Sequence, residues 1–175
     1  ASSESTVSCD LIGLPGGEYD VTVYNADLGL SNEETFTSTL DIVSVTPSSG
    51  SFGGGSLLAI TGTGFDSDDG VAVTVCDNVC ETVSVTTSQI ECLTPDNDAT
   101  GVTELCDVVV TQASGFAESS LAFTYDRALT PSVTSIDPVR GGTGGGTLIT
   151  ITGTGFAASG NKVMIDGSIC DIASE

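Results

Sequence analysis

Six cysteines carry the clearest chemistry in the sequence. Four lie close together in the middle of the chain and one lies near each end: Cys9, Cys76, Cys80, Cys92, Cys106 and Cys170. In an acidic chain rich in Ser, Thr and Gly, such cysteines usually form disulfides in an oxidising compartment. We therefore expect an extracellular or cell-surface protein, although spacing alone leaves the pairing open.

Acidic residues are the second group, with 24 Asp and Glu against 3 Lys and Arg and a formal charge of -21. Such a surface repels nucleic-acid phosphates and the anionic face of a membrane, so we expect no nucleic-acid binding and no membrane insertion. Calcium prefers oxygen ligands of this kind, and the nearest candidates in one loop are Asp66, Asp68 and Asp69. The loop completes no known calcium pattern, so a solvated acidic loop is the first interpretation and calcium the alternative.

Catalysis has few other candidates. The chain has no histidine, which is the commonest general base and zinc ligand. The glycine cluster at 141–146 precedes a strand rather than a helix, so it predicts a turn and not a phosphate cradle. We expect no enzyme activity and no cofactor, and O-linked glycans on the many Ser and Thr residues are a further expectation.

The ends of the sequence carry no targeting pattern. No apolar run approaches the roughly 18 residues of a membrane span, and the start has neither a basic region nor an apolar core. The expectation is a mature product or an internal piece of a longer chain.

An internal repeat organises the sequence. Residues 53–65 read GGGSLLAITGTGF, and residues 144–156 read GGGTLITITGTGF. Short β-branched runs between Gly, Pro and Asn, without helical periodicity, predict an all-β sandwich. Clear strands are expected at 71–75, 79–85, 106–111 and 121–125.

The repeat predicts one complete domain at 42–130, because residues 131–175 match only its first half. Residues 1–41 resemble its second half, through matches of 18–23 with 105–110 and of 36–37 with 123–124. A half sandwich exposes strand edges and an apolar face, so residues 131–175 are expected to be completed by residues 1–41 of the next unit.

Pro47 followed by 53–65 resembles the signature of the IPT/TIG family, the immunoglobulin-like domains of plexins, growth-factor receptors and transcription factors. The paired cysteines at 75–80 and 90–95 are similar to those in tandem IPT arrays of fibrocystin-like extracellular proteins. The resemblance implies tandem immunoglobulin-like sandwiches used for spacing and contact. It also implies that strand entry and core packing depend on Pro47, Gly62, Phe65, Pro138, Gly153 and Phe156.

The repeat also narrows the cysteine pairing. Cys80 and Cys92 align with Cys170 and Cys9, which predicts a Cys80–Cys92 bond and a bond from Cys170 to Cys9 of a neighbouring unit.

The remaining two cysteines are absent together from the incomplete domain. Cys76 aligns with Asp166 and Cys106 aligns with Tyr19, as expected if Cys76 and Cys106 are bonded to each other.

These features favour a structural unit of an extracellular filament or elongated surface array, assembled head to tail from copies of itself. The units are either separate protomers or one continuous polypeptide. The alternative is a ligand-binding or adhesive fragment of a cell-surface receptor ectodomain, although the sequence has no Trp and few Tyr for an interface.

Overall fold

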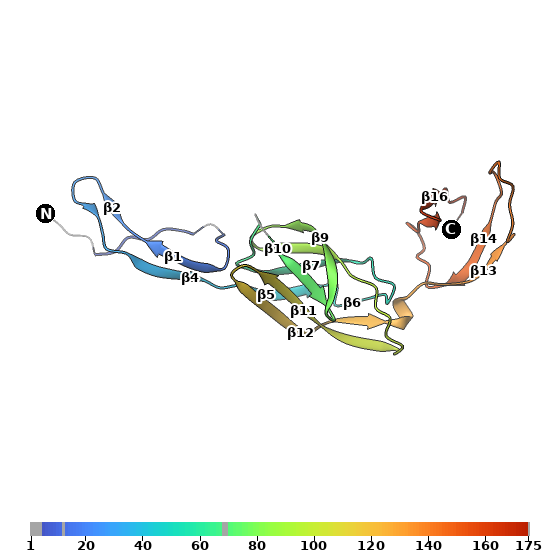
Figure 1. Cartoon of the computed structure of the whole chain (residues 1–175), viewed down its shortest axis with the longest axis horizontal. Coiled ribbons are helices and arrows are strands. Elements are labelled where there is room, and N and C mark those ends of the chain that lie inside the picture. Colours follow the sequence, from blue (N-terminus) through green and yellow to red (C-terminus); the bar gives the residue numbers. More distant parts are fainter. Residues whose placement is uncertain (1–4, 12, 68–69, 175) are drawn as a thin grey trace.

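The chain is laid out as three parts in a row, a complete sandwich with smaller strand pairs on either side (Figure 1). The computed structural model describes residues 5–11, 13–67 and 70–174. Within these residues every regular element is a β-strand apart from one 3-10 turn, η1 (Arg127–Leu129). The predicted all-β fold is confirmed.

Eight strands build the central sandwich: β5 (Asp41–Thr46), β6 (Ser49–Gly50), β7 (Leu57–Thr63), β8 (Ala72–Val75), β9 (Asn78–Val85), β10 (Gln89–Leu93), β11 (Thr103–Gln112) and β12 (Gly115–Asp126). One layer runs β5-β7-β10-β9 and the other β9-β8-β11-β12-β6. Strand β9 joins the layers, because it pairs with β8 up to Cys80 and with β10 from Glu81 onward.

The core follows from the alternation of side chains along each strand, which turns every second residue inward. Pairs of inward residues two positions apart come from both layers, such as Leu58 with Ile60 on β7 and Val108 with Val110 on β11. The main cluster of the core contains residues that are at most 3% exposed: Phe52, Leu58, Ile60, Phe65, Val73, Val75, Cys80, Ile90, Cys92, Cys106, Val108, Val110, Phe123 and Tyr125.

The N-terminal part holds β1 (Gly17–Val21), β2 (Tyr24–Asn25), β3 (Gly29–Leu30) and β4 (Glu34–Ser38). Strands β1 and β4 pair antiparallel, with Tyr19 opposite Phe36. At the aligned place in the central sandwich, Cys106 lies opposite Phe123. The two segments that match in sequence therefore also pair in the same register as far as Tyr19, whereas the register shift between Cys106 and Val108 has no counterpart in β1-β4.

The C-terminal part holds β13 (Ser132–Asp137), β14 (Thr150–Thr154), β15 (Val163–Ile165) and β16 (Ser168–Cys170). The pair β13-β14 repeats β5-β7 position by position, including its bulge, and β15-β16 repeats β8-β9. The matching partners are Ile136–Ile151 with Val45–Ile60, and Val163–Cys170 with Val73–Cys80.

The two copies of the repeat share a glycine at the position where a strand leaves no space for a side chain. A Cβ atom on Gly62 would collide with the carbonyl oxygen of Asp41 and lie 2.5 Å from the Phe65 ring. Gly153 has the same surroundings, formed by Ser132 and Phe156. Both rings thus cover their glycine, but Phe65 is fully buried whereas Phe156 remains 44% exposed.

Pro47 and Pro138 each follow directly after a strand, β5 and β13, and each follows a cis peptide bond. The glycine cluster at 141–146 forms the predicted turn, in which Gly145 and Gly146 have φ angles of 78° and 76°.

Two short connections separate the three parts. Residues 39–40 join β4 to β5, and residues 127–131 join β12 to β13. They lie beside the boundaries predicted at 41/42 and 130/131. The division into a complete domain and two complementary halves stays a prediction, because it concerns how the terminal parts are completed.

Candidate functional sites: disulfides, joints and uncovered strands

The Cys80–Cys92 disulfide lies inside the central sandwich. Cys80 is where β9 leaves β8, and Cys92 is on β10, with their Cα atoms 5.6 Å apart. Both side chains point inward and are at most 1% exposed. The bond therefore fixes the strand that connects the two layers, and it is the pair predicted from the repeat.

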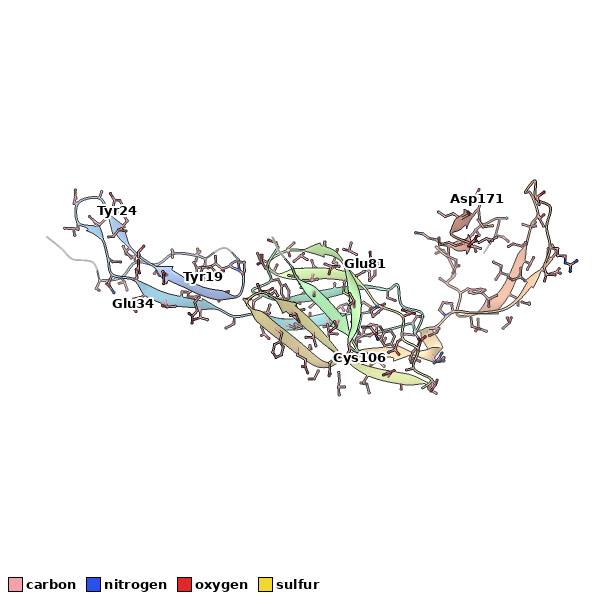
Figure 2. All side chains as sticks on the ribbon, in the orientation of Figure 1. Tyr19, Tyr24, Glu34, Glu81, Cys106 and Asp171 are labelled. Carbon is pink, nitrogen blue, oxygen red and sulfur yellow. A yellow bond between two sulfur atoms is a disulfide. The ribbon has the colours of Figure 1, made fainter. Side chains whose placement is uncertain are left out.

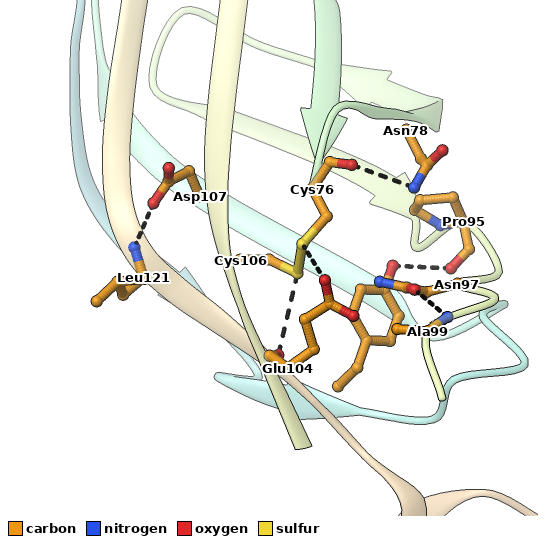
Figure 3. Close-up of a disulfide and its surroundings, with 10 residues drawn as sticks. Cys76, Asn78, Pro95, Asn97, Ala99, Glu104, Cys106, Asp107 and Leu121 are labelled. Carbon is orange, nitrogen blue, oxygen red and sulfur yellow. Dashed lines mark hydrogen bonds between the residues drawn. A yellow bond between two sulfur atoms is a disulfide. The ribbon is translucent and has the colours of Figure 1, made fainter. Parts of the chain in front are cut away.

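The Cys76–Cys106 disulfide ties the β8-β9 turn to β11, with a Cα–Cα distance of 4.8 Å (Figure 3). The turn is tight, since Cys76 and Asp77 have φ angles of 50° and 61°. Glu104 Oε1 lies 3.9 Å from Cys76 Sγ, a contact without a shared proton because the sulfur is bonded to its partner. This second predicted pair also forms in the structure.

Tyr125 forms a buried polar contact that sequence reasoning missed. Its hydroxyl donates a 2.8 Å hydrogen bond to the carbonyl oxygen of Pro95. Burial, with the nearby charges of Asp96 and Glu104, raises the pKa of Tyr125 to about 12. The Phe123 ring packs against it edge-on, with centroids 5.0 Å apart. The available signal was the alternation of two aromatic residues in Phe123-Thr-Tyr125.

The joint on the N-terminal side is a backbone contact. The Gly16 N–H donates across the joint to the Gly64 carbonyl at 2.7 Å, and within the N-terminal part the Ser38 hydroxyl donates to the Leu14 carbonyl at 3.1 Å. A shallow groove beside this joint is lined by residues that include Leu11, Leu14, Phe36 and Thr87. The two parts thus meet through the loop before β1.

The joint on the C-terminal side is built around Arg127. Its guanidinium lies 4.4 Å from the centroid of the Phe52 ring and donates to the carbonyls of Ala99 at 2.7 Å and Gly101 at 3.2 Å. Asp126 caps η1 by accepting a 2.8 Å hydrogen bond from the Ala128 N–H. The last turn before β13 is therefore held onto the central sandwich.

Cys9 and Cys170 are free in the structure, Cys9 exposed and Cys170 partly exposed. Strand β16, which ends in Cys170, lies at the opposite end of the chain from β1 and β4 (Figure 1). The predicted bond joins two units, so a single chain does not test it.

The terminal parts leave apolar side chains uncovered at positions that are buried in the centre. Figure 2 shows Tyr24 at the outer end of the N-terminal part and Asp171 on the C-terminal part, each well away from the central sandwich. The most informative exposed fractions are 77% for Val7, 48% for Val23 and 54% for Ile165. These side chains form the clearest unpartnered surfaces of the described chain.

The acidic loop gives no metal site among the described residues. The Asp66 N–H donates to Gln112 Oε1 at 3.1 Å, which anchors the start of the loop, while Asp68 and Asp69 lie outside the described residues. No group of three or more His, Cys, Asp or Glu side chains elsewhere in the described ranges is placed to hold a metal. Calcium binding therefore stays a prediction.

No helix in the described part of the chain is long and apolar enough to cross a membrane.

Comparison with known proteins identifies the family of domains to which these strands belong. A model of the IPT/TIG domain family matches residues 40–125 and 131–174. The chain therefore belongs to the IPT/TIG domain family, as its repeated motif predicts.

Particular relatives are large proteins of which this chain matches a small part. Fibrocystin-L of Mus musculus is 34% identical over 175 residues, which cover 97% of this chain and 4% of that protein. Plexin-A3 of Homo sapiens is 31% identical over 133 residues, 74% of this chain and 7% of the relative. A solved structure of the plexin A4 full extracellular region is 25% identical, covers 60% of this chain and 9% of its own, and has a TM-score of 0.45.

The compartment follows from the cysteine chemistry together with these relatives. Two formed disulfides are typical of proteins that fold in an oxidising environment. Together with the similarity to fibrocystin-L, they show that the chain is extracellular or displayed at the cell surface.

Proposed function

We propose that this chain is a segment of a large cell-surface ectodomain, in which consecutive IPT/TIG domains act as spacers and contact modules and catalyse no reaction. The observation that carries the proposal is the pair of successive family matches, 40–125 and 131–174, within a chain that spans 4% of fibrocystin-L. A module repeated along one polypeptide suits a mechanical role, because each copy adds length without adding a catalytic centre.

The joints support a spacer. One connection has two residues, 39–40, and the other is held by Arg127 through two carbonyls and the face of Phe52. Short, contacted linkers limit the angles between neighbouring domains, whereas long Gly and Ser linkers behave as flexible coils. A row of such domains projects outward from its anchor.

The absence of histidine supports a non-catalytic role, since the chain lacks the side chain that most often exchanges protons near neutral pH. The comparisons favour the ectodomain over the filament protomer that the sequence first suggested.

The spacer role is tested by displaying one, two or three copies of the chain between a membrane anchor and a fluorescent reporter. Energy transfer from the reporter to a membrane dye should fall with each added copy. A matched series, with residues 127–131 replaced by a Gly/Ser linker of the same length, should show a smaller fall per copy. Equal energy transfer with one, two and three copies would contradict the spacer role.

The contact role has a separate readout. Beads coated with the purified chain should bind cells or beads that display an ectodomain partner, and clustering of coated beads with one another would indicate contact between copies. If beads neither bind nor cluster while energy transfer still falls, the chain spaces but does not adhere.

A further inference from the structure

The C-terminal part is an uncovered copy of the first half of the central sandwich. Its strands pair in the same register as β5, β7, β8 and β9. Ile165 aligns with Val75, yet Ile165 is 54% exposed and Val75 is fully buried. The difference lies in what packs against these strands and not in the strands themselves.

The central sandwich shows what cover such strands take. Strand β11 pairs antiparallel with β8 and places Val108 opposite Val75. Strand β10 pairs with β7 and places Ile90 opposite Ile60. The missing cover for the C-terminal part is therefore one strand like β10 and one hairpin like β11-β12.

The N-terminal part resembles that cover in sequence. Strands β1 and β4 repeat the three pairs from Glu104–Tyr125 to Cys106–Phe123, which precede the register shift of β11. In sequence, Val21 then aligns with Val108. Before these strands, Val7 and Cys9 have the spacing of Ile90 and Cys92. Val7 is 77% exposed where Ile90 is fully buried, so this segment also lacks the surface that its equivalent packs against.

We propose that the N-terminal segment of a second copy of this chain completes the C-terminal part as an intermolecular sandwich, closed by a disulfide between Cys9 and Cys170. Transfer of the central register predicts the backbone pairs Val21 with Ile165 and Val23 with Val163. This is strand addition at an exposed edge, in which backbone hydrogen bonds give affinity and alternate side chains fill the core.

The contact is heterologous. The two surfaces lie at opposite ends of the chain, so each added copy leaves one of each surface free and the assembly grows (Figure 1). The charge of -21 on every copy opposes association, and this repulsion is screened beyond about 8 Å at 0.15 M salt. Growth should therefore be faster at higher ionic strength.

The covalent step needs an oxidant, which we take to be a low-molecular-weight disulfide such as oxidised glutathione. The Cys9 thiolate attacks it to give a mixed disulfide and one thiol, and the Cys170 thiolate then displaces the second thiol. The two protein thiols together lose two electrons and two protons. The low-molecular-weight disulfide accepts them and is reduced to two thiols. The thiolates are exposed enough for this exchange, since Cys9 is exposed and Cys170 partly so.

The test uses the purified 175-residue chain with both central disulfides intact, incubated with reduced and oxidised glutathione in 0.15 M salt. A denaturing gel should show a ladder in steps of 17.5 kDa that collapses on reduction. Peptide mapping should find Cys9 joined to Cys170 as the dominant link. Monomer with both thiols free, or a mixture dominated by Cys9–Cys9 and Cys170–Cys170 links, would overturn the proposal.

Two variants separate docking from the reactivity of an exposed thiol. Moving the thiol by one residue, in Cys9→Ser with Ser8→Cys, places it on the opposite face of the added strand and should abolish the ladder. Val23→Asp keeps both thiols but should also lose the ladder, whereas the control Leu28→Asp, at an 87% exposed turn residue, should keep it. Circular dichroism checks that the central sandwich of each variant stays folded.

A ladder from Cys9→Ser with Ser8→Cys as strong as that of the parent chain would also overturn the proposal. The spacer function does not depend on this inference, because energy transfer in a single displayed polypeptide can fall with copy number even when separate chains do not join.

Discussion

The central sandwich and the C-terminal part share a sequence pattern and a strand register but differ in burial. Val75 is fully buried and Ile165 is 54% exposed, although both lie at the same place in equivalent strand pairs. Register is local, because turns and the alternation of side chains set it within each pair. Burial is not local, because it requires strands that arrive from elsewhere in sequence or from another chain.

The N-terminal part extends the same comparison. It pairs Tyr19 with Phe36 where the centre pairs Cys106 with Phe123, and Phe36 is 38% exposed. Each terminal part therefore has one face that resembles an opened sandwich.

Removal of a core aromatic ring should give the largest difference in stability loss between the two copies of the repeat. Phe65→Ala should destabilise the central sandwich by about 3–5 kcal/mol, because a fully buried ring is lost. The matched change Phe156→Ala, at a 44% exposed ring, should change stability by about 1 kcal/mol or less. Urea unfolding followed by near-ultraviolet circular dichroism measures both. Equal losses would mean that the C-terminal part is as well packed as the centre.

The disulfides should rank next. Replacing Cys80 and Cys92 with Ala should cost about 3 kcal/mol, and replacing Cys76 and Cys106 about 4 kcal/mol, since the second bond closes the longer loop, with sequence separations of 12 and 30. Urea midpoints of the oxidised chains test this ranking.

The free cysteines provide the control for the disulfide series. In a dilute monomer, Cys9→Ser with Cys170→Ser should leave the urea midpoint unchanged, because neither thiol is bonded there. A large loss in this variant would show that the ends of one chain stabilise each other.

Tyr125 should give the central sandwich an alkaline limit. Its pKa is raised to about 12 from an ordinary value near 10, so the folded state holds the proton more tightly than the unfolded state. Stability is therefore unaffected by this group below about pH 10 and falls as pH rises towards 12. Tyr125→Phe should remove that fall, and should cost about 1–2 kcal/mol at pH 7 because the Pro95 carbonyl loses its donor. A pH slope that persists in Tyr125→Phe would assign the limit to another group.

Among the changes expected to destabilise the central sandwich, Arg127→Ala should have the smallest effect. Arg127→Ala removes its contact with the Phe52 ring and its hydrogen bonds to the carbonyls of Ala99 and Gly101 at the surface, and should cost about 1 kcal/mol. Small-angle scattering should show a wider range of angles at this joint, whereas the control Arg140→Ala should not. An unchanged scattering curve would mean that the linker is rigid without Arg127.

The strands and disulfides were predictable because the sequence contains the same unit more than once. Runs expected at 71–75 and 79–85 form β8 and β9 within one residue at each end. The joint loss of Cys76 and Cys106 from the incomplete copy indicated their bond, which spacing alone does not.

Other features depend on contacts that no local pattern contains. Tyr125 reaches the Pro95 carbonyl, and Arg127 lies over Phe52, only after the two layers have packed. Strand β9 pairs first with β8 and then with β10, and this change of partner likewise depends on tertiary packing. The repeat has no second example of these contacts, because Ser38 and Leu40 occupy the aligned positions of the N-terminal part.

The most direct test of the two complementary halves is amide hydrogen exchange on the chain before and after oxidation with glutathione. The Cys76 N–H donates to the Asp107 carbonyl between β8 and β11, so the hydrogen-bonded pairs across an equivalent seam alternate with the valine pairs. In the dilute monomer, amides of β7, β8 and β11 should exchange slowly, and those of Thr22, Met164 and Asp166, which align with Val109, Thr74 and Cys76, quickly. After assembly these three amides should become protected, while the solvent-exposed turn at Leu28 should not. Terminal strands that are protected in the monomer, or that remain unprotected after oxidation, would contradict the account.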